Sequence, residues 1–154
     1  MIDARRLSRP YTTSDNPESS EGTIKYYNFS DIKELIKAPP SSTRALIDVR
    51  ENNELYHHGT IPGSLNIPLN SFPEVFTITA DEFERLVGFT RPKKDVELIF
   101  FCHAGIRSFQ AAFRAKMAGW SHVGNYSGGW VDWTENRGKV LKVNPPELMT
   151  GKET

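Results

Sequence analysis

Short apolar runs alternate with stretches of helical spacing along most of this chain. The runs at 45–49 and 96–101 consist almost entirely of apolar residues and predict strands buried on both faces of a sheet. Shorter strands are expected at 24–27, 65–68 and 122–126, and helices at 31–36, 50–56, 81–87 and 108–117. This alternation predicts an α/β fold with a central parallel sheet of about five strands and helices on both faces.

Local signals place the ends of several predicted helices. Ser30 is the expected cap of the first helix, and the helix at 81–87 is expected to be capped near Thr79. In the helix at 108–117, Phe109, Ala112, Phe113 and Lys116 recur at helical spacing.

Polar sequence marks both ends of the chain. Residues 1–23 lack an apolar pattern and predict a flexible N-terminal segment. Their arginines and the serines and threonines that follow leave open the remnant of a transit peptide. The folded domain is expected at 24–137, and 138–154 is expected to be an extended or disordered tail. The loop at 70–79 cannot be placed from its sequence.

Composition excludes several classes of protein. Nineteen basic and nineteen acidic residues give no net charge, so no large basic field favours nucleic acid or an anionic membrane. No apolar run approaches the roughly 18–20 residues of a membrane span. The single cysteine excludes an intramolecular disulfide, and an unpaired thiol suits a reducing compartment. We expect a mitochondrial location, with a cytoplasmic one as the alternative.

The single cysteine, Cys102, follows directly on the apolar run that ends at Phe101. A short loop with one glycine comes next, and then helical sequence begins. Backbone N–H groups at such a position can form an anion-binding nest, and the helix dipole favours a negatively charged sulfur. Cys102 is therefore the predicted nucleophile, although a buried structural cysteine is the alternative. The expected anion-binding residues are His103, Ala104, Gly105, Ile106, Arg107 and Ser108. Ser108 is also a candidate helix cap.

Four segments in order resemble the single-domain rhodanese (thiosulfate sulfurtransferase) family. They are Leu46-Ile47-Asp48-Val49-Arg50, the stretch from Gly59 to Pro68, the loop from Cys102 to Ser108, and the stretch from Tyr126 to Trp133. The resemblance implies a persulfide on Cys102, which takes sulfane sulfur from thiosulfate or a persulfide and passes it to cyanide or a thiol such as glutathione. It implies no metal or organic cofactor. A protein sulfur acceptor is a further expected partner.

Three other functions use the same fold. The domain could relay sulfur for a partner enzyme, or it could be a protein-binding module without turnover of its own. Cysteine-dependent phosphatases of this architecture have five residues between the cysteine and the arginine. Here four residues separate Cys102 from Arg107, which favours a sulfur-sized site. Arg107 is the one certain cation of this loop, so we expect weak binding of thiosulfate or preference for another donor.

Several residues outside the loop have structural rather than chemical interpretations. Asp48 and Arg50 are expected to form a buried ion pair or turn that supports the site. His57 and His58 predict a surface turn and not a metal site. Trp130 and Trp133 are expected to pack in the core from one helix face. Three phenylalanines are candidates for the hydrophobic edge of the site: Phe72, Phe76 and Phe89.

Overall fold

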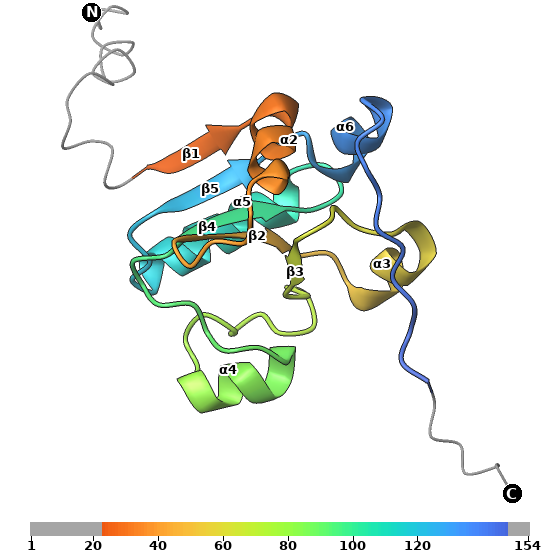
Figure 1. Ribbon diagram of the computed structural model, residues 1–154. Coiled ribbons are helices and arrows are strands. Elements are labelled where there is room, and N and C mark those ends of the chain that lie inside the picture. The colour runs from red at the N-terminus through yellow and green to blue at the C-terminus, as the bar shows by residue number, and fades with distance from the viewer. Residues whose placement is uncertain (1–22, 148–154) are drawn as a thin grey trace, which may run out of the picture.

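A five-stranded parallel sheet forms the centre of the protein (Figure 1). The computed structural model describes residues 23–147. The strands are β1 (Ile24–Tyr27), β2 (Arg44–Asp48), β3 (Leu65–Asn66), β4 (Glu97–Phe101) and β5 (Val123–Tyr126). Their order across the sheet is β1-β5-β4-β2-β3, and every pairing is parallel. The helices are α2 (Phe29–Lys37), α3 (Asn52–His58), α4 (Ala80–Val87), α5 (Ile106–Met117) and α6 (Gly129–Glu135). The predicted fold class is confirmed.

Two apolar layers cover the two faces of the sheet. Successive side chains of a strand point to opposite faces, so Phe100 of β4 joins one layer and Phe101 the other. Helices α4 and α5 pack on the first layer, and α2 and α6 pack on the second. Trp130 and Trp133 are buried in that second layer, as predicted. The residue after β4, Cys102, belongs to the first layer and lies at the carboxyl end of a central strand.

The first helix begins earlier than its sequence predicts. Asn28, not Ser30, is the N-cap of α2: its side chain accepts from the Asp31 N–H, and the Asp31 carboxylate accepts from the Asn28 N–H, both at 2.9 Å. This reciprocal capping box fixes Asn28, because Ser30 has no acidic residue at the matching position. Thr79 caps α4 as predicted, and its hydroxyl accepts from the Glu82 N–H at 3.2 Å.

Helix α5 turns small side chains toward the sheet. Its buried residues are Ser108, Ala111, Ala112 and Ala115. Phe109 and Phe113, which share helical spacing with Ala112, are half exposed instead. Small residues on the buried face let the helix backbone approach the sheet closely, so the large apolar residues lie on the outer side. This close approach brings the first turn of α5 onto the end of β4.

Two segments for which no helix or strand was predicted also pack against the domain. Within the loop at 70–79, Val75 and Phe76 are buried, and the Phe76 ring contacts the rings of Phe100 and Trp120. Phe76 is thus a core residue and not an edge of the site, while Phe72 and Phe89 are partly buried against the same layer. After α6, Leu141 exchanges two backbone hydrogen bonds with Thr60. The first part of the predicted tail is therefore extended along the domain.

The predicted flexible segment falls almost wholly on residues 1–22, which lie outside the described residues. Among residues 23–147, none of the helices combines the length and the apolar character that a membrane span requires.

Candidate active site: the Cys102 loop

The sulfur of Cys102 lies beneath a loop whose backbone donates to it. The Gly105 N–H donates to Sγ at 3.1 Å, and the Ser108 N–H donates at 3.4 Å. The Ser108 hydroxyl lies 3.3 Å from the same sulfur. Cys102 is only 1% exposed. Converging N–H groups of this kind suit a sulfur that carries negative charge.

Gly105 sets the course of this loop. Its φ of 91° is left-handed, and a β-carbon there would overlap the backbone of Ser127. Gly105 is also the N-cap residue of α5, which begins at Ile106. Ser108 therefore lies in the first turn of the helix and does not cap it, which corrects the capping prediction. Its contact with sulfur is the role that the structure shows.

A second glycine turn holds the loop from the other side. The Trp130 N–H donates to the carbonyl of Cys102 at 2.8 Å, and the Val131 N–H donates to that of His103 at 3.1 Å. Gly129, with a φ of 62°, permits this approach, because a β-carbon there would lie 2.5 Å from the Cys102 carbonyl oxygen. The start of α6 thus anchors the backbone of Cys102 and His103.

Asp48 and Arg50 form a buried ion pair below this anchor. Asp48 is fully buried and Arg50 is 1% exposed. The Arg50 guanidinium donates to both carboxylate oxygens, at 3.0 and 2.7 Å, and the Thr60 hydroxyl adds a bond of 2.6 Å. The guanidinium also lies 4.5 Å from the centre of the Trp130 ring. The pair therefore packs against Trp130, whose N–H donates to the Cys102 carbonyl.

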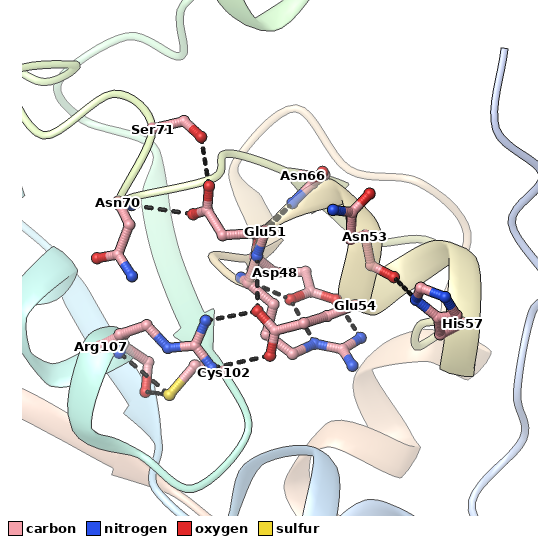
Figure 2. A network of polar contacts seen from close by, with 12 residues as sticks. Asp48, Glu51, Asn53, Glu54, His57, Asn66, Asn70, Ser71, Cys102 and Arg107 are labelled. Atoms are coloured by element: carbon pink, nitrogen blue, oxygen red, sulfur yellow. Dashed lines mark hydrogen bonds and ion pairs between the residues drawn. The ribbon is translucent and has the colours of Figure 1, made fainter.

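The charge of Arg107 is matched by a carboxylate that the sequence analysis did not identify. Two guanidinium nitrogens of Arg107 donate to the two oxygens of Glu54 in α3, at 2.6 and 3.0 Å (Figure 2). Hydrogen bonds from Arg107 hold the pKa of Glu54 below its ordinary value, and the same bonds raise the pKa of Arg107. Arg107 is thus not the free cation that the loop sequence suggests. The two residues are 53 positions apart, so local spacing gave no signal for Glu54.

The other predicted loop residues lie at the surface. His103, Ala104 and Ile106 are exposed around the buried sulfur. Their N–H groups lie in the loop, but the bonds to Sγ come from Gly105 and Ser108. The rim of the site is therefore formed by one imidazole and two apolar side chains.

His57 and His58 lie on the surface at the end of α3, as predicted. A ring nitrogen of His57 lies 2.8 Å from the Asn53 carbonyl oxygen. Within residues 23–147, no group of three or more His, Cys, Asp or Glu side chains is arranged to hold a metal ion.

Comparisons with known proteins show the family to which the chain belongs. Residues 29–136 match the Rhodanese-like domain family. The chain is 34% identical over 140 residues to a thiosulfate:glutathione sulfurtransferase of Saccharomyces cerevisiae, covering 90% of this chain and 99% of that protein. It is 33% identical over 118 residues to the mitochondrial thiosulfate sulfurtransferase RDL2 of the same yeast, covering 77% and 78%. The crystal structure of RDL2, a single-domain sulfurtransferase, superposes with a TM-score of 0.71 over 79% of this chain and 97% of that one, at 32% identity. The chain belongs to the rhodanese-like family.

Proposed function

We propose that this protein is a sulfurtransferase that carries sulfane sulfur as a persulfide on Cys102. The observation that carries the proposal is the sulfur of Cys102 at the end of β4, with the N–H groups of Gly105 and Ser108 donating to it. The thiosulfate sulfurtransferases of yeast that resemble the chain support the class of reaction.

In the first half-reaction, the Cys102 thiolate attacks the outer sulfur of thiosulfate. The bond between the two sulfurs of thiosulfate breaks, sulfite leaves with the bonding electron pair, and a cysteine persulfide remains. The total charge of −3 is the same on both sides. The loop N–H groups that donate to Sγ are placed to hold negative charge as it moves from the attacking sulfur to the new terminal sulfur.

In the second half-reaction, an acceptor thiolate or cyanide attacks the terminal sulfur, and the Cys102 thiolate is released. Glutathione is the proposed small-molecule thiol, because one relative is a thiosulfate:glutathione sulfurtransferase. A protein thiol remains an alternative acceptor, since His103, Ala104 and Ile106 form an exposed rim that a macromolecule can reach. The mitochondrial relative RDL2 supports a mitochondrial location for this chain.

Thiocyanate formation and intact mass test the proposal together. The purified protein is incubated with thiosulfate and cyanide, and the Cys102→Ser variant serves as the matched control. We expect thiocyanate from the wild type alone. Thiosulfate without cyanide should add the mass of one sulfur to the wild type and nothing to the variant. A wild type that shows neither product would contradict the proposal.

The same experiment separates the alternatives. An added sulfur that moves only to a protein thiol, without turnover of cyanide or glutathione, would indicate a relay. Hydrolysis of an aryl phosphate that depends on Cys102, with no sulfur transfer, would indicate a phosphatase. The four residues between Cys102 and Arg107 favour sulfur over the larger tetrahedral phosphate.

A further inference from the structure

Glu54 holds the loop arginine through two hydrogen bonds (Figure 2). The side chains of Arg107 and Glu54 are 23% and 32% exposed, so the pair is shielded from water more than a surface pair. Bidentate geometry between a guanidinium and a carboxylate also fixes the orientation of both groups. The charge of Arg107 is therefore compensated in place, at the edge of the loop that surrounds Cys102.

The carboxylate of Glu54 is itself held in position by α3. The Glu51 N–H donates to Glu54 Oε1 at 2.9 Å, as half of a capping box at the start of that helix. The Glu51 carboxylate in turn accepts from the Asn70 N–H at 3.0 Å and from the Ser71 hydroxyl. Glu54 thus contacts Arg107 from the start of α3, which is hydrogen-bonded to the loop at 70–79. The position of the Glu54 carboxylate is therefore fixed by its surroundings as well as by Arg107.

The sum of charges at the site follows from this arrangement. Arg107 and Glu54 cancel, and the neighbouring Glu51 carboxylate and a Cys102 thiolate leave the sum negative. A donor that carries two negative charges gains no attraction from this set. Because Coulomb energy is proportional to the donor's charge, a dianion is affected twice as strongly as a monoanion of the same shape.

We propose that Glu54 is a specificity-determining positioning residue, which compensates Arg107 and thereby turns the site from dianionic thiosulfate toward singly charged sulfane donors. This inference rests on the proposed sulfur transfer. The favoured class comprises hydropersulfide anions and thiosulfonate anions. With a thiosulfonate, the Cys102 thiolate attacks the outer sulfur, the sulfur–sulfur bond breaks and a sulfinate leaves with the electron pair. The total charge is −2 before and after this step.

The test compares two donors that differ by one charge, thiosulfate and methanethiosulfonate anion, in the wild type and in Glu54→Gln. Glutamine keeps the shape and keeps an oxygen that can accept from the Glu51 N–H. In a two-step transfer, kcat/KM for the donor reports the donor step alone. If the variant raises kcat/KM for the monoanion about threefold, we expect it to rise about tenfold for thiosulfate, the square of that factor. The ratio between donors should therefore shift about threefold toward thiosulfate, through KM.

Two variants control the interpretation. Glu82→Gln removes an equal charge from an exposed ion pair with Arg85 on α4, and it should leave the donor ratio unchanged. The double variant Glu54→Gln with Arg107→Gln removes both charges, and it should return the ratio close to that of the wild type. A change in the reactivity of Cys102 affects both donors alike and cancels in the ratio. A purely structural role of Glu54 would lower kcat/KM for both donors equally.

An unchanged donor ratio in folded Glu54→Gln would overturn the inference, even if sulfur transfer itself proceeds. Absence of sulfur transfer from either donor in the wild type would instead refute the proposed function. Ionic strength provides a measurement on the wild type alone. Because the summed charge at the site is negative, we expect added salt to raise kcat/KM for both donors, and for thiosulfate by about the square of the factor for methanethiosulfonate. A steep fall for thiosulfate only would mean that Arg107 acts as an uncompensated cation, which contradicts the inference whether or not the variant folds.

Discussion

Replacing Asp48 by Asn should remove a large part of the stability of this domain. The Asp48 carboxylate is fully buried and accepts from the Arg50 N–H, the Arg50 guanidinium and the Thr60 hydroxyl. An asparagine would turn an amide N–H toward one of these donors and would leave the Arg50 charge buried without its counter-ion. Breaking a buried pair in this way costs about 3–5 kcal/mol. Since domains of this kind unfold with about 5–15 kcal/mol in total, about a fifth or more of the stability should be lost.

Urea and thermal unfolding, followed by circular dichroism, measure this loss. We expect the midpoint temperature to fall by about 10–20 °C. The control is Glu82→Gln, which removes the same charge from an exposed pair and should change the free energy of unfolding by less than about 1 kcal/mol. A second variant, Asp48→Asn with Arg50→Met, removes the uncompensated charge and should recover part of the loss. If Asp48→Asn alone costs less than about 1 kcal/mol, the reasoning from a buried charge is refuted.

Two further predictions concern the supports of the Cys102 loop. Gly129→Ala should cost at least about 1–2 kcal/mol from its left-handed φ and more from overlap with the Cys102 carbonyl, and it should slow thiocyanate formation. Gly63→Ala, which has a similar φ and open space around it, should show the backbone cost alone, so equal losses for the two variants would count against the overlap. Because Arg107 lowers the pKa of Glu54, the pair stabilises the fold above the ordinary carboxyl pKa of 4.5, and this contribution is lost as pH falls through the lowered value. In urea unfolding across pH, the difference in the free energy of unfolding between wild type and Glu54→Gln should therefore shrink below about pH 4.5. A difference that does not change with pH would refute this contribution of the ion pair.

The sequence predicted the features of this protein that depend on neighbouring residues. Burial of apolar runs on both faces of a parallel sheet leaves a simple signature, so all five strands were found within one or two residues of their ends. The thiol loop was found because Cys102, Gly105 and the helix start are adjacent in the chain. The pairing of Asp48 with Arg50 was predicted because an unpaired charge at a buried strand end is energetically costly.

The prediction of the α2 cap failed because it depended on a choice between equivalent local patterns. Asn28 and Ser30 are both good caps, and only the reciprocal bond with Asp31 decides between them. The spacing of Phe109 and Phe113 correctly predicted a helix, but it did not predict that the helix turns its alanines to the sheet. Periodicity shows which residues share one face of a helix. Which face is buried also depends on how closely the helix packs on the sheet.

The pairing of Arg107 shows why charge in an anion site cannot be counted along the loop. The groups that reach Cys102 Sγ are two backbone N–H groups and the Ser108 hydroxyl, which carry no net charge and suit a thiolate and a persulfide alike. Discrimination between donors of different charge must therefore come from side chains around the loop. The cation there is paired with Glu54, whose position is set by α3 and not by the loop. Under the proposed function, the loop backbone binds the transferred sulfur, and a residue 53 positions away sets how strongly the charge of the donor affects the reaction.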